Sequence, residues 1–127
     1  DHCLLSFAGY SLAGLAALYA MLHTTTFRCC ASISGSLWYP GWTEYLGQHI
    51  KNIGSQSLVY LSLGKAEVKT RSALMQSNKV RTEYTEFLLS EHLSGSAVFF
   101  EWNNGNHFYE IPQRITKALL WILNTKN

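Results

Sequence analysis

Four short apolar runs, separated by longer segments with helical features, constrain the fold of this chain most strongly. The runs span residues 2–8, 28–33, 58–63 and 97–102. None of them alternates cleanly between polar and apolar residues, a pattern typical of parallel strands that are covered on both faces. Strict alternation of such strands with helices predicts an α/β fold of about four parallel strands joined by right-handed crossovers.

Helices are expected over residues 12–22, 43–50, 79–92 and 112–124. In the last of these segments Pro112 stands in the first turn, where a helix tolerates proline. Three of the segments carry large side chains at helical spacing, namely Leu15, Leu18, Tyr19 and Leu22, then Val80, Tyr84, Phe87, Leu88 and Glu91, and then Ile115, Leu119 and Ile122. We expect residues 1–127 to form a single domain, because a chain of this length has room for one core.

Composition excludes several classes of protein. Charged residues make up 14% of the chain and the net charge is +2, which argues against a nucleic-acid surface or a polybasic membrane anchor. No run reaches the length of a membrane span, and no basic segment typical of a signal peptide precedes the first run. Three cysteines, two of them adjacent at Cys29 and Cys30, make neither a disulfide framework nor a zinc site. We expect a cytoplasmic protein without cofactor or metal, in which the adjacent cysteines pack as small buried strand residues.

A nucleophile-elbow pattern, G-x-S-x-A over residues 9–13, joins the first predicted strand to the first predicted helix. In such a turn the serine adopts a strained backbone with positive φ, so the residues two before and two after it must be small, as Gly9 and Ala13 are. The turn raises the Ser11 hydroxyl above the sheet and aims the backbone N–H of Leu12 at a developing oxyanion. The alternative is a serine that only caps the helix.

A serine nucleophile needs a general base, and His107 is the best placed of the five histidines. It lies in the turn-rich sequence 103–108, directly after the fourth predicted strand. Catalytic loops of parallel sheets gather at the carboxyl ends of the strands, so Ser11 and His107 would share one edge. Serine early and histidine late is also the chain order of α/β hydrolases. The alternative is a loop histidine that bonds only within its own turn.

Glu67 is the best candidate for the acid that orients His107, because it follows the carboxyl end of the third predicted strand. From there a carboxylate can reach the Nδ1–H of the imidazole and fix its tautomer. Two alternatives stay open. Either Glu67 pairs at the surface with Lys65, Lys69 or Arg71, or a Ser–His pair works without a strong acid.

An aromatic sequence over residues 34–42 follows the second predicted strand, on the same edge as Ser11. Trp38 and Tyr39 in it, together with Tyr10 of the elbow, are the predicted substrate-binding residues. The aromatic side chains of 34–42 could equally well cover the core, and the sequence favours neither interpretation.

Four motifs follow one another along the chain: GYSLAGL at 9–15, SISGSLWYP at 32–40, YLSLG at 60–64 and EWNNGNHF at 101–108. Together they resemble an esterase family of the α/β hydrolases, which includes siderophore (enterobactin-type) esterases and esterase-D-like enzymes. The resemblance covers nearly the whole chain, and four motifs in this order are much more specific than any one of them.

The resemblance implies a carboxylic-ester hydrolase in which Ser11 attacks, His107 is the base and Glu67 is the acid. Relatives often carry an aspartate where this chain has Lys65, and some relatives are thought to work with a Ser–His dyad.

Members of this family have several strands before the elbow, and a loop after one of them gives the second oxyanion donor. The resemblance therefore implies that this chain corresponds to the C-terminal half of the α/β-hydrolase fold. The three connecting segments would lie on one face of the sheet and the last helix on the other. The first strand, residues 2–8, would be an apolar edge that recruits a partner, either another copy or the N-terminal half.

The leading hypothesis is a serine hydrolase that acts on a small-molecule ester through an acyl-enzyme intermediate. A thioesterase or an acyltransferase would use the same residues. A hypothesis from a different class is a catalytically incomplete half-domain that serves only as a structural or interaction module.

Overall fold

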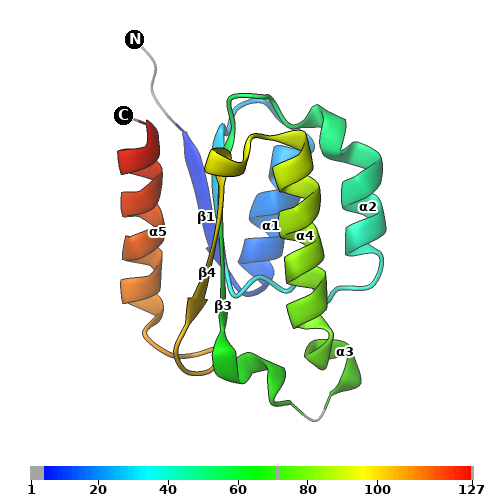
Figure 1. Ribbon diagram of the computed structural model, residues 1–127, viewed down its shortest axis with the longest axis vertical. Helices are drawn as coiled ribbons and strands as arrows, with labels where there is room; N and C mark the ends of the chain where they lie inside the picture. The colour runs from blue at the N-terminus through cyan, green and yellow to red at the C-terminus, as the bar shows by residue number, and fades with distance from the viewer. Residues whose placement is uncertain (1–4, 71, 127) are drawn as a thin grey trace.

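The computed structural model describes residues 5–70 and 72–126, which form a four-stranded parallel sheet flanked by helices (Figure 1). The strands are β1 (Ser6–Tyr10), β2 (Cys29–Ile33), β3 (Leu58–Gly64) and β4 (Val98–Asn103), and they lie side by side in chain order. All neighbouring pairs are parallel, which confirms the predicted α/β fold. The first strand runs further along the chain than expected, and residues 2–4 of the predicted strand lie outside the described residues.

Four of the helices lie where the sequence predicted them, namely α1 (Leu12–Met21), α2 (Trp42–His49), α4 (Asn78–His92) and α5 (Ile111–Lys126). The short helix α3 (Ala73–Gln76) was not predicted. Short 3₁₀ turns occur at η1 (Ile50–Asn52), η2 (Lys65–Val68) and η3 (Gly95–Ala97). Figure 1 shows α1, α2 and α4 on one side of the sheet and α5 on the other, as the resemblance implied. Among the described residues, no helix is both long enough and apolar enough to cross a membrane.

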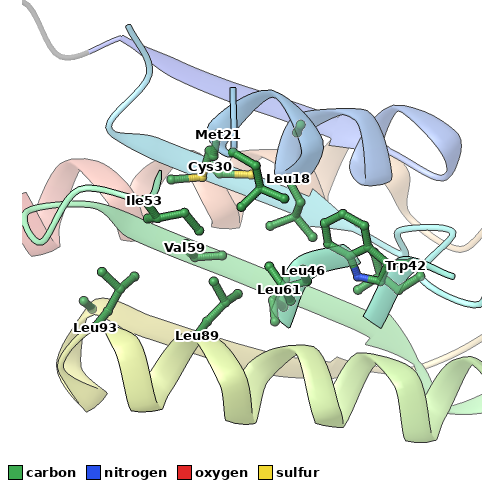
Figure 2. Close-up of a cluster of buried hydrophobic side chains, with 14 residues drawn as sticks. Leu18, Met21, Cys30, Trp42, Leu46, Ile53, Val59, Leu61, Leu89 and Leu93 are labelled. Atoms are coloured by element: carbon green, nitrogen blue, oxygen red, sulfur yellow. The ribbon is translucent and has the colours of Figure 1, made fainter. Parts of the chain in front are cut away.

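The sheet buries an apolar cluster on each face. The larger cluster joins the sheet to α1, α2 and α4 through residues such as Leu18, Leu46 and Leu89 (Figure 2). The smaller cluster joins the sheet to α5 through Ala118 and Ile122. Because both faces are covered, the strands need no polar face, which explains why their sequences do not alternate.

The adjacent cysteines belong to β2 and point to opposite faces of the sheet. Cys30 lies in the larger cluster, beneath α1, whereas Cys29 lies in the cluster beneath α5. Both are buried. The prediction that they pack as small strand residues is confirmed.

The buried face of α4 is not the one that the large side chains at helical spacing suggest. Val80, Tyr84 and Phe87 point outward and are 67%, 48% and 55% exposed. The buried residues of α4 are instead Asn78, Thr82, Thr85 and Leu89.

Hydrogen bonds explain why polar residues of α4 face the core. The Trp42 indole N–H of α2 donates to the Thr85 hydroxyl at 3.1 Å, and the Asn78 amide donates to the Gly35 carbonyl at 3.3 Å. A hydrogen bond to a partner offsets the free-energy cost of removing a polar group from water. The spacing of large side chains alone therefore does not identify the buried face of this helix.

The register of the strands aligns their carboxyl ends at one edge. Tyr10 of β1 lies beside Ile33 of β2, which lies beside Ser62 of β3, and Gly64 of β3 lies beside Asn103 of β4. The loops that follow these residues therefore meet, as expected for a parallel sheet.

Candidate active site

A continuous chain of hydrogen bonds joins Ser11, His107 and Glu67 at the carboxyl edge of the sheet. The Ser11 Oγ lies 2.9 Å from the Nε2 of His107, and the Nδ1 of His107 lies 2.7 Å from the Oε1 of Glu67. An ionised carboxylate only accepts hydrogen bonds, so Nδ1 carries the proton that faces Glu67. In a neutral imidazole this leaves Nε2 with its lone pair toward the Ser11 hydroxyl. The fold thus brings residues 96 positions apart in the sequence into one chain of hydrogen bonds.

The backbone of the elbow holds Ser11 in a strained conformation, with φ 61° and ψ −123°. This fits the positive φ that the motif predicted, and such strain is common where a side chain must be aimed. Gly9 is required for steric reasons, because a Cβ there would lie 2.1 Å from the carbonyl oxygen of Ala13. The Ser11 side chain makes no capping hydrogen bond to α1, so the helix-cap alternative does not describe this serine.

The N–H of Leu12 lies at the start of α1, directly after Ser11. The first N–H groups of an α-helix have no partner within the helix, and the aligned peptide dipoles make this end attractive to negative charge. A negative oxygen that develops on a group bonded to Ser11 would form next to this end of the helix.

Tyr10 supports His107 from the side of β1. Its hydroxyl donates to the backbone carbonyl of His107 at 2.9 Å, and the two rings lie 4.8 Å apart between centroids. Burial, followed by the nearby charge of Glu67, raises the pKa of Tyr10, so the phenol keeps the proton that it donates. Tyr10 therefore holds the loop that carries His107.

Glu67 lies in η2 with a side chain that is only 5% exposed. Its Oε2 accepts the backbone N–H of Gly64 and the hydroxyl of Ser34, both at 2.5 Å. Burial raises the pKa of Glu67, but the hydrogen bonds from His107, Ser34 and Gly64 outweigh burial and hold the pKa below its ordinary value. Glu67 is therefore a buried carboxylate that stays ionised. Its side-chain partners are the His107 ring and, at 3.9 Å, the Arg114 guanidinium rather than a surface lysine, and Arg71 lies outside the described residues.

Sequence analysis missed a group of buried residues behind Glu67, of which Arg114 of α5 is the most notable. Arg114 is 2% exposed, and its guanidinium bonds to Asn103, Ser34 and Ser62. The sequence does contain one signal that Arg114 is buried. It stands on the same helical stripe as Ala118 and Ile122, and that stripe is otherwise apolar.

A cavity of about 280 Å³ opens beside Ser11 and His107. Its other lining residues include Trp38, Met75 and Phe108, with Lys69 and Thr70 at the polar side. This cavity is large enough for a small ester group to reach the Ser11 hydroxyl.

A second hollow of about 370 Å³ runs along α1 from Leu12 to Tyr19 and is almost entirely apolar. The three residues predicted to bind substrate are thus separated. Trp38 lines the cavity at Ser11, Tyr39 lines the apolar hollow, and Tyr10 lies in neither lining.

Comparisons with known proteins find similarity in structure rather than in sequence. Neither a family model nor a curated protein matches this chain. The siderophore hydrolase EstA from Aspergillus nidulans matches with a TM-score of 0.67 and 17% identity, over 96% of this chain and 48% of that one. The fold is shared with known esterases.

Two further structures show the same likeness. The siderophore hydrolase EstB from Aspergillus nidulans matches with a TM-score of 0.60 and 20% identity, over 88% of this chain and 46% of that one. The Pyrococcus furiosus esterase PF2001 matches with a TM-score of 0.54 and 10% identity, over 96% of this chain and 54% of that one. The chain spans about half the length of the structures that it matches, and at these identities the likeness shows the fold.

Proposed function

We propose that this chain carries the nucleophile, base and acid of a serine ester hydrolase. The observation that supports the proposal most strongly is the hydrogen-bonded path from Ser11 through His107 to a buried, ionised Glu67, with Ser11 held at positive φ on the elbow. A serine that merely packs or caps needs neither the strained backbone nor a histidine oriented by a carboxylate.

The proposed mechanism has two halves. In acylation, the Nε2 of His107 takes the Ser11 proton while Oγ attacks the ester carbonyl, and the N–H of Leu12 donates to the oxyanion that forms. Glu67 stabilises the imidazolium through Nδ1–H. His107 then gives its proton to the departing alcohol, which leaves an acyl group on Ser11.

In deacylation, His107 takes a proton from a water molecule that attacks the acyl carbonyl, and then returns it to Ser11 Oγ. The acid product leaves and the resting arrangement is restored. A thiol ester would follow the same path, and an alcohol in place of water would give acyl transfer.

The proposed substrates are esters with a modest acyl group, because the cavity beside Ser11 measures only about 280 Å³. Two of the similar structures are named as siderophore hydrolases, so ester-linked siderophores belong in the substrate panel beside simple acyl esters.

The experiment that tests this function is pre-steady-state hydrolysis of p-nitrophenyl acetate and p-nitrophenyl butyrate. An acyl-enzyme mechanism predicts a burst of about one p-nitrophenol per protein, followed by slower turnover. The Ser11→Ala variant should show no burst. Parallel assays with a thioester, and with an added alcohol acceptor, separate esterase from thioesterase and transferase activity. A folded protein without a burst would contradict the proposal.

A second candidate is an interaction module, favoured by the surface along α1 and β1. The sequence of α1, LAGLAALYAM, has no charged residue, and its outward residues Leu12 and Tyr19 are 63% and 49% exposed. A helix that is apolar on every side is normally buried. In the described part of the chain β1 is also an edge strand, with β2 as its partner.

We propose that this surface pairs with a second copy of the chain through the β1 edge. Sedimentation velocity should show a dimer that dissociates on dilution. Ala8→Pro should weaken it, because Ala8 is an exposed residue of β1 and proline cannot donate a backbone hydrogen bond to a pairing strand. A monomer at every concentration would rule out this pairing.

A further inference from the structure

Arg114 places a positive charge beneath the carboxyl ends of the inner strands. It comes from α5, which lies on the opposite face of the sheet from α1, α2 and α4 (Figure 1). Its Nε donates to the Asn103 side chain at 2.9 Å, and its Nη2 donates to the hydroxyls of Ser34 and, at 3.3 Å, Ser62. These partners follow or belong to three strands, so the guanidinium joins the ends of β2, β3 and β4.

Ser34 connects this guanidinium to the candidate active site. An arginine has only donors, so the Ser34 hydroxyl must accept from Arg114, and its own proton is then free for Glu67. The Ser34 Oγ lies 2.5 Å from the Oε2 of Glu67, while the Nη2 of Arg114 lies 3.9 Å from the same oxygen. The path from Arg114 through Ser34 to Glu67 therefore has one consistent direction of donation.

The backbone of Ser34 is strained in a way that serves this contact. Its φ is 46°, a conformation that residues other than glycine seldom adopt, and it occurs directly after β2. Strain of this kind persists only where the surroundings fix it, and it often marks a side chain that has to be aimed. Here the aimed group is the hydroxyl between Arg114 and Glu67.

The hydrogen bonds of Arg114 satisfy only part of its buried guanidinium. Within the described residues its Nη1 has no hydrogen-bond partner, which is unfavourable for a buried donor. The charged and titratable groups that face Glu67 are His107 from the loop after β4, Arg114 from α5 and Tyr10 from β1. Of these, Arg114 is the permanent cation.

We propose that Arg114 and Ser34 are positioning residues that hold the Glu67 carboxylate charged and aimed at His107. The proposal rests on the proposed function only for its effect on kcat, because the titration of the Glu67 carboxyl can be measured without any substrate. Oε2 takes the hydrogen bonds from Ser34 and Gly64, which leaves Oε1 for the Nδ1–H of His107.

A matched pair of variants tests the proposal, namely Ser34→Ala and Ser62→Ala. Both remove a buried hydroxyl that accepts from Arg114, but only Ser34 touches Glu67. The side-chain carboxyl resonance of Glu67, assigned with Glu67→Gln, is followed by ¹³C NMR as the pH is lowered. Loss of a donor to a carboxylate disfavours its charged form, so the Glu67 titration should move to higher pH in Ser34→Ala and stay in place in Ser62→Ala. Equal behaviour of the two variants would overturn the proposal.

Activity gives the second readout. Ser34→Ala should lower kcat about tenfold, the value of one hydrogen bond to a charged group, with KM little changed. The deficit should grow toward acid pH, whereas Ser62→Ala should stay close to the original protein throughout. A deficit independent of pH, or one shared by Ser62→Ala, would show a merely structural role. If the unmodified protein has no Ser11-dependent hydrolysis, the proposed function fails, while the NMR titration still decides the hold on Glu67.

Discussion

Two carboxylates near the same end of the sheet, Glu67 and Glu101, have similar local chemistry. Each accepts a hydroxyl hydrogen bond at 2.5 Å, Glu67 from Ser34 and Glu101 from Tyr60. For each of them burial raises the pKa, and hydrogen bonds and cationic neighbours outweigh burial and lower it below the ordinary value. A charged, hydrogen-bonded carboxylate is therefore not by itself the mark of a site in this molecule.

The difference lies in what the second carboxylate oxygen contacts. In Glu67 it contacts the His107 ring, which in turn reaches Ser11. In Glu101 it accepts from the ammonium of Lys117 at 2.6 Å, and that side chain is 59% exposed. One carboxylate is joined to a proton acceptor beside a cavity, and the other ends in solvent. The partner of the second oxygen, rather than the charge state of the acid, therefore distinguishes Glu67 from Glu101.

The largest effect on kcat should come from removing the Ser11 hydroxyl, at the end of the hydrogen-bonded chain from Glu67 through His107. Ser11→Ala removes the proposed nucleophile and should lower kcat by on the order of 10⁶. Ser94→Ala is the control, since Ser94 is exposed and its hydroxyl bonds to Ser96 away from the cavity, and it should leave kcat nearly unchanged. Ester hydrolysis under saturating substrate measures both. Comparable losses in the two variants would remove Ser11 from its proposed place.

The same substitution at Glu67 and at Glu101 should have very different effects on hydrolysis. Glu67→Gln should lower kcat by about 10³–10⁴, because an imidazole oriented by an amide is held in the wrong tautomer. The loss should be smaller than that of His107→Ala. Glu101→Gln should change the hydrolysis rate little, since Glu101 contacts Tyr60 and Lys117 rather than His107. A silent Glu67→Gln would favour a Ser–His dyad.

A smaller difference between Glu67→Gln and Glu101→Gln should appear in how the free energy of unfolding depends on pH. A pKa that is lowered by folding stabilises the native state above the ordinary carboxyl pKa, and this contribution is lost as pH falls through the lowered pKa. Glu67→Gln should therefore flatten the acid part of the unfolding curve. Glu101→Gln should flatten it less, because its ion pair is partly exposed and screened by salt.

Urea unfolding between neutral pH and about pH 3 measures this flattening. If Glu101→Gln flattened the pH dependence of the unfolding free energy more than Glu67→Gln, the result would contradict this prediction.

Much of the fold, and the three residues of the hydrogen-bonded chain at its carboxyl edge, follow from patterns in the sequence. Apolar runs between helical segments predict four parallel strands, and the rule that parallel strands present their loops at one edge brings Ser11, His107 and Glu67 together. The elbow adds a steric requirement that Gly9 meets. These are local signals that depend only on the spacing of a few residues.

The parts that sequence reasoning missed depend on contacts between distant elements. The outward face of α4 carries Val80 and Phe87, because Thr85 finds a partner in Trp42 across the core. Arg114 looks like a surface residue until α5 is seen to pack on the sheet. Such burial depends on three-dimensional neighbours, which periodicity along one helix does not describe.

The central claim, that Ser11 is an activated nucleophile, is tested most directly by labelling with a fluorophosphonate probe. Such a probe phosphonylates a serine whose hydroxyl is activated by a neighbouring base, without the need for a known substrate. Intact-mass and peptide analysis should find one adduct per chain, on Ser11, slow labelling in His107→Ala and none in Ser11→Ala. An unlabelled folded protein, or an adduct on another residue that persists in Ser11→Ala, would contradict the account.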